Sequence, residues 1–246
     1  MIETVLVPLD GSTFCEYALP IARGFAKRYG AALRLALVHV PIPTALIDGV
    51  PQASMDIEGR AREHEQSYLE ALTERLRDED GLDVEAAHLD GPVVGTLETH
   101  ARSVGADVIV MSTHGRGGLS RAWLGSVADG LARRAPVPVL LVRPDTETEP
   151  SPEPAGAFRN ILVPLDGSPF AEEALDFAAE IARRDGAACT LVRVVVPIPT
   201  VTLPLIDPAL NLEFDDIAAR RTAAREYLER VAEGLREDGI DVATVV

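Results

Sequence analysis

The stretch VLVPLDGSTF at residues 5–14 recurs as ILVPLDGSPF at residues 161–170, and this repeat decides the architecture. With a constant offset of 156, residues 1–44 match residues 157–200 at 24 of 44 positions without a gap. Self-similarity at a fixed period indicates one structural unit that is used more than once. The chain of 246 residues therefore predicts a tandem repeat of one fold.

Aliphatic runs and amphipathic segments alternate along the first copy. The amphipathic segments indicate a helix that Ser12 caps and Gly30 ends, followed by helices at 57–77, 93–104 and 126–134. The aliphatic runs indicate strands at 4–9, 33–40, 84–89, 107–111 and 137–143. This alternation predicts an α/β fold, with a five-stranded parallel sheet and right-handed crossovers. We expect a doubly wound sheet and take its strand order to be 3-2-1-4-5. Aromatic residues make up only 4% of the chain, which suits aliphatic parallel strands.

The chain is expected to have three parts. Residues 1–143 form a complete unit, and residues 144–156, PDTETEPSPEPAG, form an extended, mobile linker rich in Pro and Glu. Residues 157–246 form a partial second copy that lacks the last two strands and the glycine-rich loop between them. Such a half-sheet has an uncovered edge and an uncovered apolar face. It borrows partners, is partly disordered or is truncated, and we favour truncation.

The net charge disfavours certain binding partners, and the cysteines indicate the redox environment. The net charge is −16, from 23 basic and 39 acidic residues, which repels nucleic acid and anionic membranes. Cys15 and Cys189 lie in different copies without metal-like spacing, so we expect buried thiols in a reducing cytoplasm. No basic leader and no apolar run of membrane-spanning length is present in the sequence, so we expect no membrane partner. The acidic run 78–80 is interpreted as a solvated helix end.

Two segments with candidate ligand-binding residues follow the first and fourth expected strands. Doubly wound sheets bind ligands where the strand order reverses, which is between these two strands. Asp10 follows the first strand, where its carboxylate can accept hydrogen bonds from ribose hydroxyls. The glycine-rich stretch STHGRGG at 112–118 follows the fourth and can present backbone N–H groups to phosphates. Ser126 begins the next helix and adds its amides and dipole. Each segment alone is a weak signal, and their joint placement favours an anionic ligand.

The motif VPLDGS at 7–12 and the segment ADVIVMSTHGRGGLSRAWLGSVADGLARRAPVPVLLVR at 106–143 resemble the universal stress protein family. The resemblance covers residues 1–143 and, as a partial copy, 158–246. It implies the five-stranded doubly wound fold and ATP binding, which many members share. The family motif is Gly-x-x-Gly, nine residues, then Gly-Ser or Gly-Thr. Gly115 and Gly125-Ser126 match its second part, whereas Ser112 replaces its first glycine.

The resemblance implies an adenine-nucleotide site in the first copy, with ATP as ligand, alone or with Mg²⁺. Asp10 would face the ribose and the backbone of Val40 the adenine edge. The implied nucleotide-binding residues are Pro8, Leu9, Asp10, Val40, Met111, Ser112, His114, Gly115, Arg116, Gly125, Ser126 and Val127. His114 has a second interpretation, as a loop residue that fixes the turn through a backbone hydrogen bond. Arg116 and Arg121 could reach a phosphate, but we favour their interpretation as solvated surface arginines. Trp123 is expected to pack the turn before Gly125 against the sheet rather than stack on a base.

Three functions are weighed against one another. The first is a cytoplasmic, stress-response regulatory protein that binds ATP at one site, because Asp166 and Val196 repeat Asp10 and Val40 without a phosphate loop. The second is a nucleotide-free, dimerising interaction module. The third is an α/β enzyme, which is disfavoured because the sequence has neither a P-loop nor a nucleophile–base signature. We therefore expect no enzyme activity beyond slow ATP hydrolysis or autophosphorylation. A homodimer through the edge strand 137–143 is expected.

Overall fold

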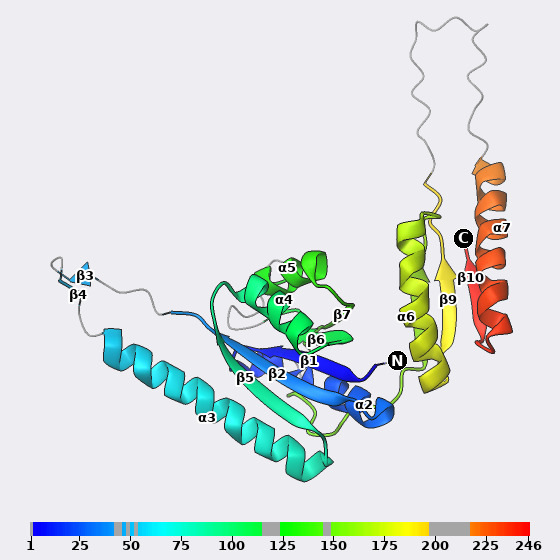
Figure 1. The fold of residues 1–246 in the computed structure, drawn as a ribbon. Coiled ribbons are helices and arrows are strands. Elements are labelled where there is room, and N and C mark those ends of the chain that lie inside the picture. Colours follow the sequence, from blue (N-terminus) through cyan, green and yellow to red (C-terminus); the bar gives the residue numbers. More distant parts are fainter. Residues whose placement is uncertain are drawn as a thin grey trace, which may run out of the picture. The chain divides into compact units, whose positions relative to one another are not determined.

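The chain divides into two compact units, Met1–Gly156 and Ala157–Val246 (Figure 1). A computed structural model describes residues 2–41, 46–47, 50–51, 54–114, 124–144, 149–196 and 217–246. Of residues 46–47, 50–51 and 54–56 it describes the backbone alone, without side chains. Among all the described residues, no helix combines the length and the apolar character that a membrane crossing needs.

The first unit is built on a five-stranded parallel sheet of order β5-β2-β1-β6-β7. This arrangement confirms the predicted order 3-2-1-4-5. The central strand β1 pairs with β2 from Thr4↔Ala32 to Leu9↔Leu37, and on its other side Val5 pairs with Val108 of β6. The strands are β1 (Thr4–Leu9), β2 (Ala32–His39), β5 (Val84–Asp90), β6 (Val108–Ser112) and β7 (Val139–Val142).

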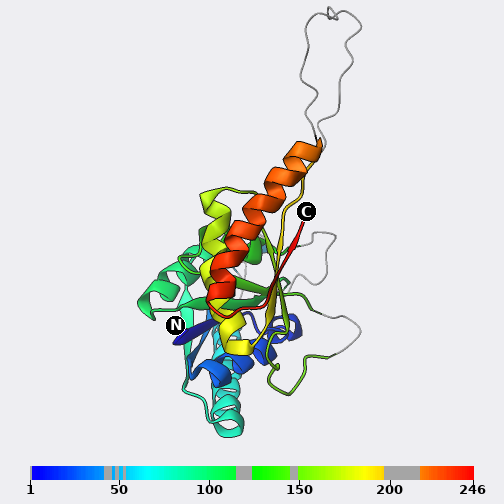
Figure 2. The same cartoon turned by 90° about the vertical axis from the view of Figure 1, so that its right-hand side faces the viewer.

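Helices cover both faces of this sheet (Figures 1 and 2). On one face α2 packs on β1 and β2, and α3 packs on β2 and β5. On the other face α4 and α5 pack together over a core that includes Leu6, Val38 and Ile109. The helices of this unit are α1 (Thr13–Glu16), α2 (Leu19–Tyr29), α3 (Ser54–Asp80), α4 (Val93–Ser103) and α5 (Ser126–Arg134).

Two local features differ from the sequence expectation. The single helix predicted between Ser12 and Gly30 is two helices, α1 and α2, with Tyr17 and Ala18 between them. Pro20 explains the break, because it lacks the backbone N–H that a continuous helix would donate to Glu16. The loop expected at 41–54 contains a short antiparallel ladder of β3 (Leu46–Ile47) and β4 (Val50–Pro51).

The second unit contains a three-stranded parallel sheet of order β10-β9-β8. Its hydrogen bonds repeat those of the first unit. Tyr68 donates to Glu16 over 3.1 Å, and Tyr227 donates to Glu172 over 2.8 Å. A hydrogen bond from the long helix to a glutamate of an earlier helix is therefore present in both units. The elements of the second unit are β8 (Asn160–Pro164), α6 (Pro169–Asp185), β9 (Ala188–Val192), α7 (Ile217–Glu237) and β10 (Val242–Val245).

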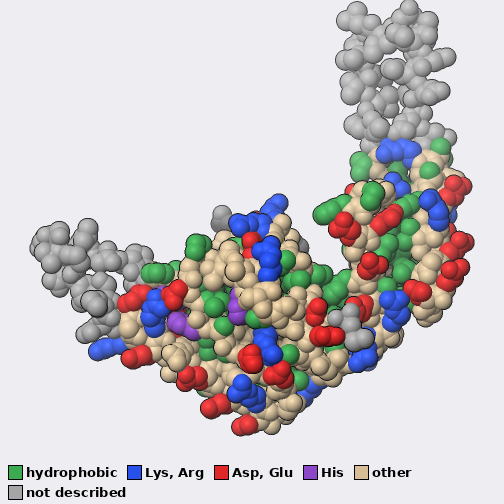
Figure 3. All heavy atoms as spheres, viewed as in Figure 1, with side chains coloured by type: hydrophobic (Ala, Val, Ile, Leu, Met, Phe, Trp, Pro, Cys, Tyr) green, Lys and Arg blue, Asp and Glu red, His purple; other side chains and the backbone are tan. Residues whose placement is uncertain are grey.

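One face of the second sheet is exposed in the described structure. Leu162 is 66% exposed and Val194 is 79% exposed, whereas their equivalents Leu6 and Val38 lie in the core beneath α4 and α5. Hydrophobic side chains are accordingly visible on the surface of this unit (Figure 3). The strands of the second unit thus keep the apolar pattern of the first, although the described residues of the second unit contain no equivalent of the covering helices α4 and α5.

The end of the predicted linker lies against α2 of the first unit. The N–H of Ala155 donates to the carbonyl of Pro20 over 2.7 Å, and Arg28 donates to the carbonyl of Ala155 over 2.8 Å. Arg23 donates to the carbonyl of Pro152 over 2.5 Å. Gly24 allows this approach, because a Cβ there would overlap the Ala155 carbonyl. Residues 152–155 are therefore bound to α2 by three hydrogen bonds.

Candidate functional site

Asp10 stands at the carboxyl end of β1, in a turn that fixes its carboxylate. Its Oδ1 accepts hydrogen bonds from the Ser12 N–H over 2.9 Å and from the Ser12 hydroxyl over 2.6 Å. Gly11 between them has φ of +74°, a left-handed conformation that glycine adopts without strain. The Ser12 side chain in turn caps α1. The half-buried carboxylate of Asp10 is thereby oriented at the edge of the sheet.

Cys15 lies directly below this turn and is chemically inert. Its thiol is buried and donates to the carbonyl of Ser12 over 2.9 Å. Burial is the main cause that raises the pKa of Cys15 to about 12, with the negative charge of Asp10 adding to the effect. The thiol stays protonated at neutral pH and offers no nucleophile. Cys15 and Cys189 are both free and buried, as the sequence predicted.

The carboxyl end of β6 is joined to the start of α5. The residues Ser112, Thr113 and His114 are all buried. The N–H of Gly125 donates to the carbonyl of Thr113 over 2.8 Å. A Cβ on Gly125 would come 3.0 Å from that carbonyl, a tight contact, so the close approach favours glycine. This contact fixes the N-terminus of α5 beside the end of β6.

The first turn of α5 presents backbone N–H groups at this place. Gly125 is the N-cap and makes no side-chain capping hydrogen bond. Ser126 is exposed and Val127 is half-buried, and both lie in the first turn. The first N–H groups of a helix have no partner within it, and the helix dipole adds positive potential there. Such a terminus favours an anion.

His114 makes a contact that neither sequence interpretation included. Its Nδ1 lies 3.0 Å from the hydroxyl of Thr113, and its backbone N–H donates to the Ser112 hydroxyl over 3.3 Å. Both partners are side chains of the same strand end. The predicted residues Gly115 and Arg116 lie outside the described residues, as do Arg121 and Trp123.

The remaining predicted residues occupy neighbouring strand ends. Leu9 and Met111 are buried in β1 and β6, and Pro8 is buried beside Leu9. Val40 follows β2 and is 53% exposed. Adjacent strands are about 4.8 Å apart, so the ends of β2, β1 and β6 form one continuous edge. The structure thus gathers Asp10, Ser112 and the Gly125 turn at the point where the strand order reverses.

A second polar cluster, which the sequence reasoning missed, lies between α3 and the sheet. Glu65 of α3 contacts two histidines through one oxygen, Oε2, at 2.7 Å from Nδ1 of His39 and 2.9 Å from Nε2 of His88. His39 and Glu65 are buried, and the side chain of His88 is 19% exposed. The clue in the sequence was Glu65 itself, which occupies the apolar stripe of α3 that continues through Leu69 and Leu72.

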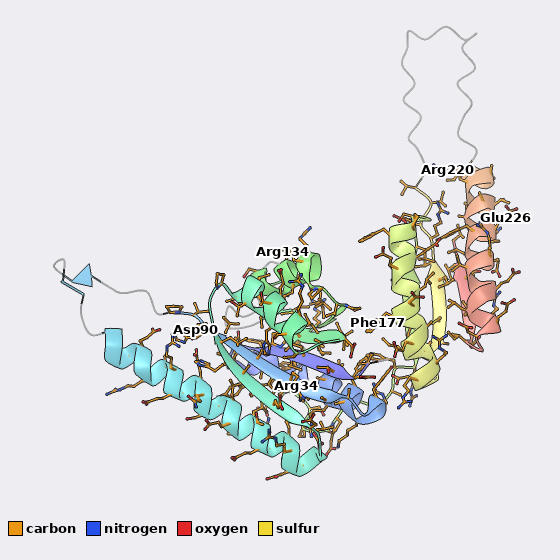
Figure 4. The ribbon with its side chains drawn as sticks, in the orientation of Figure 1. Arg34, Asp90, Arg134, Phe177, Arg220 and Glu226 are labelled. Atoms are coloured by element: carbon orange, nitrogen blue, oxygen red, sulfur yellow. The ribbon has the colours of Figure 1, made fainter. Side chains whose placement is uncertain are left out.

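A second carboxylate reaches His39 from the same helix. Glu58 lies 2.5 Å from Nε2 of His39, so both ring nitrogens face carboxylates. Burial lowers the pKa of His39, but the hydrogen bonds to Glu65 and Glu58 outweigh it and raise the pKa above its usual range. Arg62 lies next to Glu58 and pairs with Asp90 at the end of β5 over 2.7 Å. Asp90 is labelled in Figure 4.

Several known proteins are similar to this chain in sequence or in fold. A universal stress protein of Mycobacterium tuberculosis is 37% identical over 119 residues, which cover 48% of this chain and 39% of that protein. One from Thermus aquaticus is 32% identical over 145 residues, which cover 58% of this chain and all of that protein. The crystal structure of a universal stress protein from Archaeoglobus fulgidus matches with a TM-score of 0.60 at 20% identity, over 98% of this chain and 77% of the other, and shows the fold alone.

The matched part of the chain covers between 39% and 59% of the length of the mycobacterial relatives. The family model for universal stress proteins matches residues 1–143 and again residues 157–246. These two matches correspond to the two compact units of the structure. The chain therefore belongs to the universal stress protein family, which it matches once on each unit.

Proposed function

We propose that the first unit binds one adenine nucleotide, with ATP as the ligand, and that occupancy regulates a stress response. The observation that carries the proposal is the hydrogen bond from the Gly125 N–H to the Thr113 carbonyl, 2.8 Å long. It brings the N-terminus of α5 to the edge of the sheet where Asp10 follows β1. The Asp10 carboxylate, which can accept hydrogen bonds from ribose hydroxyls, and the N-terminus of α5, which favours phosphates, then lie on either side of one point.

The charge of the chain supports backbone recognition of the phosphates. With a net charge of −16, the surface as a whole repels a polyphosphate. The amides of Ser126 and Val127 and the helix dipole supply local positive potential that does not depend on side-chain charge. In this proposal Asp10 accepts hydrogen bonds from the ribose, Val40 contacts the adenine edge, and Ser112 and His114 flank the phosphates. Mg²⁺, where present, would accompany the nucleotide.

The second unit supplies a matched control for the test. Asp166 repeats Asp10, and its Oδ1 accepts from the Ser168 N–H over 2.8 Å, as Asp10 does from Ser12. Calorimetric titration of ATP, with and without Mg²⁺, is expected to give one nucleotide per chain. Asp10→Ala should abolish the heat and Asp166→Ala should leave it unchanged. Equal losses in both variants, or no heat at millimolar ATP, would refute the proposal in favour of a nucleotide-free module.

The proposed role is regulatory, without catalytic turnover. The described part of the site contains Asp10 and His114 as titratable groups, and Cys15 beneath it stays a neutral thiol. A cytoplasmic location is part of the proposal, as is a homodimer in which β7, an edge strand of the first sheet, pairs with a second copy. Multi-angle light scattering tests the dimer, and a monomer at tens of micromolar would rule it out.

A further inference from the structure

We propose that His39, Glu65 and His88 form a binding site for a divalent transition-metal ion, for which Zn²⁺ is the natural probe. Their ligand atoms all lie within 4.8 Å of one another. Two imidazoles and one carboxylate are a ligand set that zinc uses with an open fourth position. The same set, as a facial triad, suits other first-row divalent ions. This inference is independent of nucleotide binding.

The three ligands come from three elements that the fold brings together. His39 is the last residue of β2, His88 lies on the neighbouring strand β5, and Glu65 projects from α3, which covers both strands. His88 sits opposite Leu37 in the ladder, two residues before His39. Strand alternation therefore directs both histidines to the same face, toward α3.

The two distances to Glu65 require little adjustment to hold an ion, whereas the two histidine nitrogens, which lie within 4.8 Å of each other, must approach to about 3.3 Å. The Oε2 atom of Glu65 lies 2.7 Å from Nδ1 of His39 and 2.9 Å from Nε2 of His88. Ligands of a tetrahedral zinc ion, each about 2.0–2.2 Å from the metal, are separated by about 3.3 Å. An opening of roughly half an ångström at each contact makes room for the ion, within the rotamer freedom of a Glu side chain.

The surroundings have the polar support that metal sites use. Glu58 lies 2.5 Å from Nε2 of His39. In the metal-bound state Nε2–H would donate to Glu58, which leaves Nδ1 as the ligand atom and fixes the ring. Arg62 bridges Glu58 and Asp90. With both imidazoles neutral, Glu58, Glu65, Asp90 and Arg62 sum to two negative charges, which suits a dication. A groove of about 510 Å³ between α3 and β5, lined in part by Gln66 and His88, gives access from solvent.

The second unit shows that the scaffold does not need these polar residues. An offset of 156 in the strand places Val195 where the first unit has His39. The offset of 159 that matches Tyr68 with Tyr227 places Ala224 at Glu65 and Ile217 at Glu58. The offset of 158 that matches Val84 with Val242 places Val246 at His88. Apolar residues therefore fill all four positions in a unit with the same strand–helix packing, which argues that the cluster serves a ligand rather than the fold.

Titration of Co²⁺ into the nucleotide-free full chain, followed by displacement with Zn²⁺, tests the site. We expect one Co²⁺ per chain, with the intense visible absorption of a low-coordinate site, and stoichiometric displacement by Zn²⁺. The absence of saturable binding at about 1 mM ion would overturn the proposal. Binding that appears only after ATP is added would overturn it too, because that ion would belong to the nucleotide.

The ligands are tested by variants that introduce the residues found at the equivalent positions of the second unit, because these residues are compatible with the packing of the scaffold. Glu65→Ala and His88→Val introduce the alanine and the valine that stand at the equivalent positions 224 and 246 of the second unit. Each variant should weaken metal binding by at least about 100-fold, because it removes a ligand atom. Glu58→Gln, which changes only the partner of His39, should weaken it by about 10- to 100-fold. His64→Gln, at the exposed neighbour of Glu65, is the matched control and should bind as the parent does.

Circular dichroism establishes that each variant is folded before titration. If His88→Val does not fold, His88→Gln replaces it, because that side chain is partly exposed on an edge strand. Undiminished metal binding by folded Glu65→Ala and His88 variants would refute the proposal. Loss of binding in these variants with retention in His64→Gln would establish it.

Discussion

The two units carry the same scaffold in two environments, and an ion pair at the end of the long helix illustrates the difference. In the first unit Asp80 pairs with Arg23 and with Lys27, and the side chains of Asp80 and Arg23 are 2% and 8% exposed. In the second unit Arg183 and Asp238 repeat the Lys27–Asp80 pair in the open, at 48% and 57% exposure. Ala179 replaces Arg23 there. The aspartate at this helix end is thus buried against an arginine in the first copy and exposed in the second.

This comparison also corrects the sequence interpretation of the acidic run 78–80. That run was expected to be a solvated helix end. Asp78 and Glu79 are exposed as expected, but the carboxylate of Asp80 is buried between two basic side chains. The pKa of Asp80 lies below its usual range, because Arg23 donates hydrogen bonds to it and outweighs the effect of burial. One residue within a charge run can therefore be part of the core.

The largest predicted effect is that of removing the buried carboxylate. Asp80→Ala removes the nearest carboxylate from the buried Arg23, which keeps, among the described residues, only the exposed Glu79 at 3.6 Å and the Pro152 carbonyl. It should lower the free energy of unfolding of the first unit by about 3 kcal/mol. Asp238→Ala, at the exposed equivalent, should cost about 0–1 kcal/mol. Urea unfolding followed by circular dichroism measures both. Similar losses in the two variants would contradict the difference in environment.

A contrast of similar size is predicted at the apolar face of the two sheets. Leu6 is fully buried, and Leu6→Ala should cost about 3 kcal/mol through lost burial and the remaining cavity. Leu162 occupies the equivalent position at 66% exposure, and Leu162→Ala should change stability by about 0.5 kcal/mol or less. The same unfolding assay applies. A loss at Leu162 as large as that at Leu6 would mean that a partner covers the second face in solution.

The smallest effect should be equal in the two units. Tyr68→Phe and Tyr227→Phe each remove the hydrogen bond to a glutamate, Glu16 and Glu172 respectively, and Tyr68→Phe also removes a long contact of 4.0 Å with the Cys15 thiol. Each should cost about 1 kcal/mol, the typical net value for a hydrogen bond. Thermal unfolding of the two variants against the parent measures this. A clear inequality would indicate that the second unit is packed less firmly around α7 than the first is around α3.

Local sequence patterns predicted the frame of the first unit well. Aliphatic strands such as β1 and helices such as α5 were recognised with their boundaries, because periodicity is a local property. The parallel sheet followed from the alternation of strands and helices, and the strand order that we had assumed was confirmed. The break at Pro20 was missed because the apolar spacing continues across it from Phe14 to Phe25.

Features that depend on several distant elements were beyond such patterns. His39, Glu65 and His88 are separated by 26 and 23 residues along the chain and meet only after α3 packs on the sheet. The contact of Gly125 with Thr113 likewise joins two segments whose connection lies outside the described residues. The strand-end position of Asp10 was predictable, whereas its hydrogen bonds with Ser12 required coordinates.

The buried thiol beneath the Asp10 turn has a practical consequence for labelling. With a pKa of about 12, Cys15 is a thiolate in only about one molecule in 100,000 at pH 7. Burial raises the pKa of Cys189 too, so both native thiols resist maleimides and mild oxidants. A cysteine introduced at the exposed Ser126 would then be the one fast-reacting thiol of the chain. A fluorophore attached there reports directly on the start of α5, without first removing any natural cysteine.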